Sequence, residues 1–331
     1  MKALDWRFLS SEDAGHLHDA EATRWLSALH WDTRPALARI ESARSAGTLP
    51  GLIARDDRGA VRGWTFYLLH EGVLQVGAFV ADSALATATL LDAMARSREA
   101  AAASAMMFFV FPTAPDLVEQ LATRGFAVER YRYLQAELTD AGCGLPSSTP
   151  PSRAGGVAPP ESWNPARWNA VAALLRRAYA DDAARPFARG GTPLDWLEYV
   201  TQLVTTNACG SFLPEASVTL SGASPAELDG ATLLTRLTPD TAHLAQIAIA
   251  PDARGRGLAR RLLTASLDAA RTAGCARATL LVSERNAAAG RLYGAMGFEE
   301  VAAFVFALRD QPRRSVQSTV AGVVPNHARS S

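Results

Sequence analysis

The sequence has few cysteines, no net charge and no long apolar run. Its 331 residues include only Cys143, Cys209 and Cys275, an odd number with no pair at the spacing of a metal or redox site. We therefore expect a reduced, cytoplasmic location and no bound metal. Lys and Arg together number 33, as do Asp and Glu, so no overall field favours nucleic acid or an anionic membrane as a partner.

A targeting or membrane segment is also missing. The first residues, MKALDWRFLSSEDAG, contain no apolar stretch like that of a signal peptide, and no run approaches the roughly 20 apolar residues that span a bilayer. We expect neither secretion nor membrane insertion. Hydrophobic residues make up 48% of the chain, which is enough for globular cores, and the length suits two domains of about 150 residues.

A strand, a glycine-bearing turn and a helix are predicted from residue 244 onward. The apolar run Leu244–Ala250 is followed by Arg254-Gly255-Arg256-Gly257, and then by apolar residues three and four apart over Leu258–Ala273. The first amides of a helix have no partner within it, and the macrodipole adds partial positive charge. Glycine permits close backbone approach and arginine adds charge, so this turn suits a diphosphate. A plain connection with two solvated arginines is the alternative.

A second motif follows the helix. Ala278–Val282 is predicted to be a buried strand, and Asn286 opens the segment NAAAGRLYGAMGF, which ends at Phe298. Here the chain resembles the GNAT superfamily of N-acyltransferases. Residues 254–259, RGRGLA, fit that family's Q/R-x-x-G-x-G/A turn, and residues 286–298 fit its N-x-x-A-x-x-L-Y-x-x-x-G-F segment. The resemblance covers roughly residues 230–308. It implies an α/β fold (α+β, mixed sheet), mostly antiparallel, splayed at its middle and flanked by helices, with acetyl-CoA as acyl donor.

The same order of elements occurs twice in the chain. Three pairs of segments are each 172 residues apart: Leu90-Leu91 and Leu262-Leu263, Phe108–Val110 and Leu280–Val282, and Gly125-Phe126 and Gly297-Phe298. In the first half, strands are predicted at 52–55, 63–69, 73–81 and 106–111, and a helix at 85–102. We therefore predict two tandem copies, residues 1–140 and 162–310. A Pro/Gly/Ser-rich linker, 141–161, would join them, and a disordered tail, 311–331, would follow.

The first copy lacks the second copy's motif residues. At the same separation the facing pairs are Gly257 and Leu85, Ala259 and Thr87, Asn286 and Ala114, and Tyr293 and Leu121. The segment Asp82–Thr87 supplies neither glycine nor arginine, and Asp82 would repel a diphosphate. We expect the first copy to keep the packing residues of the fold without holding coenzyme A in the usual way, and to act as a structural, substrate-framing or dimerising partner.

The resemblance implies roles for individual residues of the second copy. The strand edge for the pantetheine arm would be Ile247, Ala248 and Ile249, and the diphosphate cradle would be Arg254, Gly255, Arg256, Gly257, Leu258 and Ala259. Asn286 would contact the cofactor or hold the strands apart. Tyr293 would protonate the departing thiolate. The alternative for Tyr293 is a core tyrosine whose hydroxyl is satisfied by the backbone.

The general base is left open. The strands 244–250 and 278–282 carry no acidic residue, so the candidates are His243 and Glu284 at strand ends. For each of the two, a solvated strand-end residue is the alternative. A water chain without a dedicated side chain is a further possibility.

The predicted function is N-acetyl transfer from acetyl-CoA to a primary amine, by direct attack in a ternary complex. Residues 180–212 are expected to shape the acceptor pocket, although Trp196 and Tyr199 also fit buried core positions. The alternatives are a silent acyl-CoA sensor and a small-molecule acetyltransferase with the two-copy arrangement of mycothiol synthase. Dinucleotide binding is disfavoured because the turn follows a meander of strands and no acidic ribose ligand is placed suitably after it. The acceptor, small molecule or peptide, and the state, monomer or homodimer, are left open.

Overall fold

The computed structural model describes residues 1–138, 159–182, 186–206, 209–224 and 227–311. Most of the predicted linker and nearly all of the predicted tail lie outside these residues, so both segments and the copy boundaries stay predictions. Below, the amino-terminal half means residues 1–138 and the carboxy-terminal half means residues 159–311. Within the described residues, none of the helices combines the length and the apolar character needed to cross a membrane.

Both halves are built from strands flanked by helices. The amino-terminal strands are β1 Lys2–Asp5, β2 Gly51–Arg55, β3 Val61–His70, β4 Val73–Ala81, β5 Ala105–Val110 and β6 Ala127–Glu137. The helices of that half are α1 Ser11–Leu29, α2 Arg34–Ser45, α3 Ala84–Ala95, α4 Arg98–Ala102 and α5 Leu117–Thr123. The carboxy-terminal strands are β7 Glu161–Ser162, β8 Ser211–Phe212, β9 Val218–Ser221, β10 Leu228–Thr238, β11 Thr241–Ile249, β12 Arg277–Ser283 and β13 Glu299–Asp310. The helices there are α6 Trp168–Ala178, α7 Pro193–Thr205, α8 Leu258–Thr272 and α9 Ala287–Gly294.

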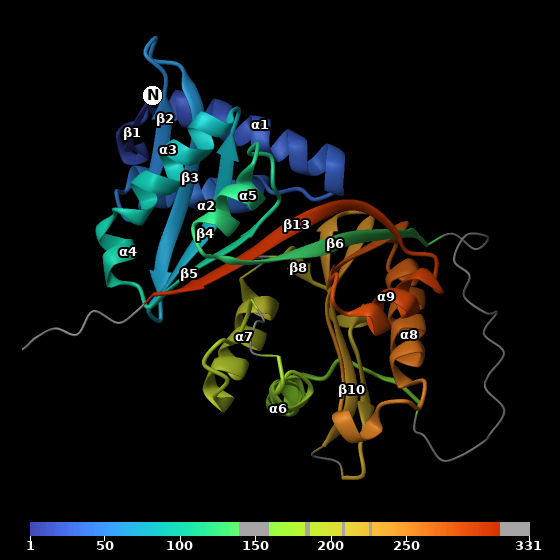
Figure 1. Cartoon of the computed structure of the whole chain (residues 1–331). Coiled ribbons are helices and arrows are strands. Elements are labelled where there is room, and N and C mark those ends of the chain that lie inside the picture. The colour runs from blue at the N-terminus through green and yellow to red at the C-terminus, as the bar shows by residue number, and fades with distance from the viewer. Residues whose placement is uncertain (139–158, 183–185, 207–208, 225–226, 312–331) are drawn as a thin grey trace, which may run out of the picture.

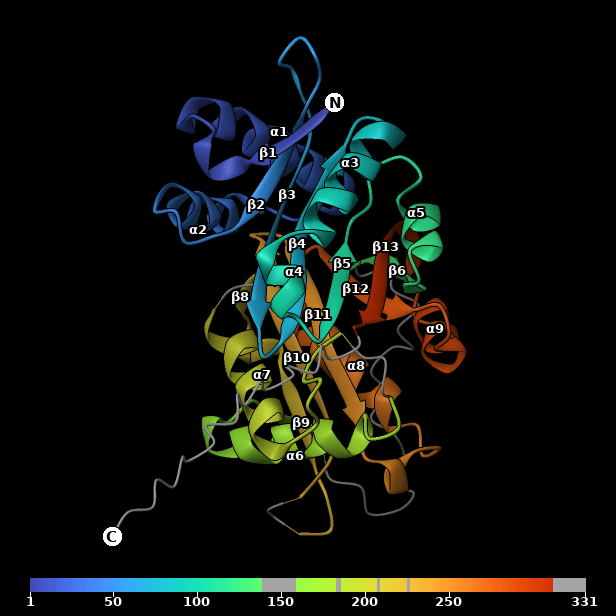
Figure 2. The same cartoon turned by 60° about the vertical axis from the view of Figure 1, so that its left-hand side comes forward.

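The two halves share one continuous sheet. Its strand order is β1-β2-β3-β4-β5-β13-β6-β12-β11-β10-β9-β7, with β8 paired to β10. The last strand of the chain, β13, thus lies between β5 and β6, and β6 lies against β12 (Figure 1). Each half therefore gives its final strand to the sheet of the other half. Helices α6 and α7 cover one face of the carboxy-terminal strands, and α8 and α9 cover the other (Figures 1 and 2).

The sheet is splayed at the same place in each half, which confirms the predicted mixed, splayed sheet. Parallel pairing of β4 with β5 ends at Val76 and Phe108, and that of β11 with β12 ends at Leu244 and Leu280. In both cases the longer strand continues without its partner. A register shift against the neighbouring antiparallel strand occurs directly after the last pair, at Gly77 in β4 and at Ala245 in β11. Such bulges bend a strand and increase its twist, which accounts for the separation.

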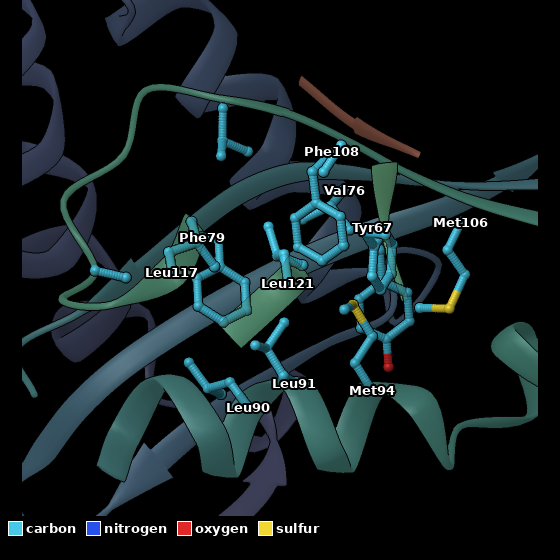
Figure 3. Packing of buried hydrophobic residues seen from close by; sticks show 14 of the residues in the cluster. Tyr67, Val76, Phe79, Leu90, Leu91, Met94, Met106, Phe108, Leu117 and Leu121 are labelled. Carbon is cyan, nitrogen blue, oxygen red and sulfur yellow. The ribbon is translucent and has the colours of Figure 1, made fainter. Parts of the chain in front are cut away.

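The gap in the amino-terminal half is filled by its own side chains. Phe79, Leu117 and Leu121 pack with the α3 residues Leu90 and Leu91 in one buried cluster (Figure 3). The equivalent positions in the other half are Ile247, Ala289 and Tyr293. The first two are smaller than their counterparts, so the carboxy-terminal gap has room for a ligand that the amino-terminal gap lacks.

Hydrogen bonds also close the amino-terminal gap. The Thr87 hydroxyl of α3 donates to the Pro115 carbonyl (3.0 Å), and the Gln120 side-chain amide of α5 donates to the Ala84 carbonyl (3.0 Å). These bonds hold α3 and α5 together across the opening. The amino-terminal half thus keeps the splay of the strands but seals it.

One predicted helix needs correction, and the last residue of the predicted linker lies in a strand. The helix predicted at 85–102 is two helices, because the Ser97 hydroxyl accepts a bond from the Ala100 N–H and starts α4. Glu161, predicted to end the linker, pairs with Thr219 in the short strand β7. Polar residues and alanine at both places gave no apolar periodicity from which either feature could be read.

Candidate active site

A cavity of about 1340 Å³ lies between the two halves. One side is formed by β11, the start of α8 and α9 of the carboxy-terminal half. The opposite side is formed by the end of α1, the connection to α2 and the first turns of α2. The cavity therefore opens at the carboxy-terminal splay and reaches across to the amino-terminal half.

The turn before α8 presents main-chain amides without partners. Gly255 and Gly257 have φ of +75° and +73°, and a Cβ added to either would meet no atom within 4 Å. In the described part of the chain, no acceptor takes a hydrogen bond from the amides of residues 255–259. The equivalent helix, α3, is instead capped by its own Ser83 hydroxyl, which accepts from the Ala86 N–H. The N-terminus of α8 is thus open to an external anion.

The residues around this turn fix its position. Arg254 donates to the Ala178 carbonyl at the end of α6 (2.8 Å), and Arg256 forms an ion pair with Asp229 at 3.6 Å. Leu258 is buried in the core, and Ala259 lines the cavity. Both arginines therefore keep their positive charge beside the turn while they anchor it.

Strand β11 offers an unpaired edge to the cavity. Ile247, Ala248 and Ile249 pair with Thr232, Ala231 and Gly230 of β10, but their other edge has no partner in β12. All three residues line the cavity. Main-chain groups without partners along a strand edge are suited to pair with the amides of an extended ligand.

The two side chains predicted on α9 lie at the same cavity. Asn286 is the N-cap of α9, and its side-chain oxygen accepts from the Ala289 N–H at 3.1 Å. Tyr293 is 5% exposed and packs edge-on against Phe298. Its hydroxyl has no hydrogen-bond partner among the described residues, whereas the hydroxyl of the buried Tyr133 donates to the Leu29 carbonyl (2.8 Å). Burial raises the pKa of Tyr293 above its usual value.

His243 is buried, so the solvated strand-end interpretation is wrong for this residue. Its side chain is in the cavity wall between Trp31 and Tyr133. The Thr279 hydroxyl donates to the Ala242 carbonyl (3.3 Å) and accepts from His243 Nδ1 (3.0 Å), which assigns the proton to Nδ1 and a lone pair to Nε2. Burial lowers the pKa of His243 to about 4, so the ring is neutral at neutral pH.

Glu284 does not belong to this cavity. Its side chain is 58% exposed and forms an ion pair with Arg130 at 3.3 Å. Glu284 directly follows β12, and its N–H donates to the carbonyl of Arg130 in the neighbouring strand β6. For Glu284 the solvated strand-end interpretation therefore applies.

The state of His243 predicts a stability effect. Between about pH 4 and 6.5 the unfolded chain binds the imidazole proton and the folded protein does not. The unfolding free energy contributed by this group therefore rises with pH across that window, by up to about 1.4 kcal/mol per pH unit, and is constant above it. Urea unfolding of wild type and His243→Asn at pH 4.5, 5.5 and 7 measures the difference. An identical pH dependence in both proteins would contradict a buried neutral imidazole.

A polar chain of side chains in the cavity was not foreseen. The Tyr179 hydroxyl donates to the Gln246 oxygen (3.0 Å), and the Gln246 amide donates to the Tyr199 hydroxyl. Trp196 is a core residue at 1% exposure, whereas Tyr199 lines the cavity. Trp25 and Trp31, which line the cavity from the amino-terminal half, could not be predicted from the sequence either, because only the fold brings α1 and the residues after it close to β11.

Comparisons with known proteins agree with this architecture. Residues 176–298 match the profile of the Acetyltransferase (GNAT) family. The GCN5-related N-acetyltransferase from Sphaerobacter thermophilus aligns with a TM-score of 0.66 and 15% identity, covering 93% of this chain and 95% of that one. A tandem GNAT protein from the clavulanic acid biosynthesis pathway aligns with a TM-score of 0.59 and 16% identity, covering 93% and 98%. At such identities the likeness establishes the fold. No curated protein matches the sequence.

Proposed function

Because residues 176–298 form a GNAT acetyltransferase domain, we propose that this protein transfers the acetyl group of acetyl-CoA to a primary amine. The reaction would take place in the carboxy-terminal half, by direct attack in a ternary complex. One observation carries the proposal. The edge of β11 that has no partner in β12 and the side chain of Tyr293 line one cavity, which Arg254 and Ala259 also line. These two residues bound the turn whose amides, 255–259, have no acceptor among the described residues.

The donor site follows from these groups. The amides of residues 255–259 would hold the diphosphate, with the charges of Arg254 and Arg256 beside it. The edge of β11 from Ile247 to Ile249 would pair with the pantetheine amides. Asn286 would keep α9 in place at the other side of the splay, since its cap fixes the start of that helix.

Tyr293 would act as the general acid. Its raised pKa keeps the phenol protonated at neutral pH, and its hydroxyl is not used by the protein in the described residues. When the amine nitrogen forms its bond to the acetyl carbon, the carbon–sulfur bond breaks and the sulfur takes the phenolic proton. This absence of a backbone partner favours the acid role over that of a core tyrosine.

His243 would take up the proton that the amine loses. The neutral ring presents the lone pair of Nε2, and no partner for Nε2 occurs in the ranges that the structure describes. Its low pKa means that the imidazolium would quickly pass its proton to water, so a short water relay through His243 fits better than a stable proton store. The amino-terminal half would take no part in donor binding, because Phe79 and Leu117 fill its gap.

Direct transfer is expected because the one cysteine among the described residues that line the cavity is not activated as a nucleophile. Cys209 lines the cavity, but burial raises the pKa of its thiol to about 11, so the thiolate is scarce at neutral pH. Initial rates measured with both substrates varied should give intersecting double-reciprocal lines, and Cys209→Ser should keep kcat within about 2-fold. Parallel lines, or loss of activity in Cys209→Ser, would indicate an acyl-enzyme instead.

A further inference from the structure

The wall of the cavity opposite the donor site is aromatic and apolar. Trp31, 9% exposed, lies with its ring 5.4 Å from that of His243. Trp25 meets Trp31 edge-on at 5.2 Å and Phe304 at 5.6 Å. The start of α2 extends this wall with Pro35, Leu37 and Ile40. An acceptor that reaches His243 from this side must therefore lie against tryptophan and aliphatic surface.

The charged residues on this side of the cavity are already engaged by protein groups. Glu21 accepts bonds from Arg24 and from the Trp25 indole (2.7 Å). Asp32 accepts from the Arg34 N–H and guanidinium, both at 3.1 Å. A second ammonium group on the acceptor would have to compete with these partners for the carboxylate oxygens.

On the carboxy-terminal side Arg236 is engaged in the same way. Its guanidinium donates to the carbonyls of Pro239 (2.7 Å) and Ala273 (3.0 Å). Arg254 likewise donates to the Ala178 carbonyl, and Asp182, which also lines this side, has an interaction partner as well. A carboxylate on the acceptor would thus have to compete with protein groups for the charges of the described residues. Polyamines, amino sugars and amino acids fit this lining less well than an amine with one charge.

We propose that the acceptor is a primary monoamine with an aromatic or bulky apolar body, which the amino-terminal half binds through Trp31 and the start of α2. This inference rests on the proposed acetyl transfer and adds the class of acceptor. The apolar body lies against Trp31, and the nitrogen reaches His243 next to the donor. The amino-terminal copy, which has sealed its own splay, thereby supplies acceptor specificity to the active half.

A panel of three amines tests this class. CoA release and N-acetyl product are measured at saturating acetyl-CoA with 2-phenylethylamine, ethanolamine and putrescine. Burial of the phenyl ring should raise kcat/KM for 2-phenylethylamine about 10- to 100-fold above the other two. A kcat/KM for ethanolamine or putrescine equal to or above that for 2-phenylethylamine would overturn the proposal.

Substitution of Trp31 locates the binding surface. Trp31→Ala should raise KM for 2-phenylethylamine about 10-fold or more and leave KM for ethanolamine within about 2-fold. The matched control is Trp168→Ala on α6, outside the cavity, where both values should stay as in wild type. An equal rise in KM for both amines in Trp31→Ala would mean that Trp31 does not contact the apolar body of the acceptor, which contradicts the proposal.

A gained charge provides a second variant that does not depend on removing a large side chain. Ala36 lines the cavity in the first turn of α2, where an acidic residue is favourable to the helix. Ala36→Asp should raise kcat/KM for putrescine about 5-fold and lower that for 2-phenylethylamine, whereas Ala38→Asp, exposed on the same helix, should change neither. An unchanged preference in Ala36→Asp would count against an acceptor site at this wall.

Calorimetric titration with acetyl-CoA separates the two proposals. If acetyl-CoA binds and none of the three amines is acetylated, the acceptor class is wrong while the donor site stands. If acetyl-CoA does not bind, the proposed function itself fails, and the acceptor class fails with it.

Discussion

Replacing Tyr293 by phenylalanine is expected to lower kcat about 10²- to 10⁴-fold, while the affinity for acetyl-CoA changes less than about 3-fold. The reason is that the variant removes one hydroxyl, and this hydroxyl has no protein partner in the described part of the chain. Without it, a thiolate of high pKa must leave unprotonated. The aromatic ring, which packs against Phe298, is kept, so the core of α9 is not disturbed.

A second tyrosine provides the matched control. Tyr67 is buried in the amino-terminal core at 3% exposure and does not line the cavity. Tyr67→Phe removes an equivalent hydroxyl and should leave kcat within about 2-fold. If Tyr293→Phe released CoA at the wild-type rate, the phenol would not be the acid. If wild type and Tyr293→Phe both showed only background hydrolysis of acetyl-CoA, a silent acyl-CoA sensor would be favoured.

Replacing Gly257 by valine is expected to weaken acetyl-CoA binding by about 100-fold or more. A Cβ added at this position would meet no atom within 4 Å, so we expect a β-branched side chain to occupy space next to the amides of residues 255–259. It would keep a diphosphate from approaching them, and charge-assisted bonds to such an anion are worth about 1.5–3 kcal/mol each. Isothermal titration calorimetry measures the effect.

Gly47 separates this effect from backbone strain. It has φ of +74°, against +73° for Gly257, and a Cβ there would also meet no atom within 4 Å. Gly47→Val should therefore cost a similar loss of stability, about 1–2 kcal/mol, without changing acetyl-CoA affinity. Equal affinity losses in the two variants would show that strain, and not access to the amides, explains the result.

Much of the donor side of the site could be predicted from the sequence. The glycines at 255 and 257 adopt the left-handed conformation that makes glycine necessary, and the helix predicted over 258–273 is α8. Residues 247–249, Asn286 and Tyr293 all border the cavity. These residues lie close together in the sequence, so the spacing of the two motifs is enough to predict them.

The acceptor side could not be predicted in this way. Trp31 and His243 are more than 200 residues apart, and no pattern in the sequence indicates that their rings lie 5.4 Å apart. The exchange of β6 and β13 could not be predicted either, because the two strands occupy equivalent places in the two copies. Only the sheet order reveals which half each strand completes.

Burial separated the two candidate bases where sequence could not. His243 and Glu284 both stand at strand ends, and the sequence placed them on an equal footing. In the fold, His243 is enclosed by Trp31 and Tyr133, whereas Glu284 pairs with Arg130 on the outer surface. The difference arises because the side chains of Trp31 and Tyr133 cover the start of β11, whereas Glu284 follows the end of β12 with its side chain exposed.

A crystal structure of the protein with acetyl-CoA tests the central claim most directly. The account predicts one bound molecule, with its diphosphate on the amides of residues 255–259, its pantetheine arm along β11 and its sulfur within hydrogen-bonding reach of the Tyr293 hydroxyl. Acetyl-CoA bound between β4 and β5 of the amino-terminal half, with the Gly255–Gly257 turn free of ligand, would contradict it.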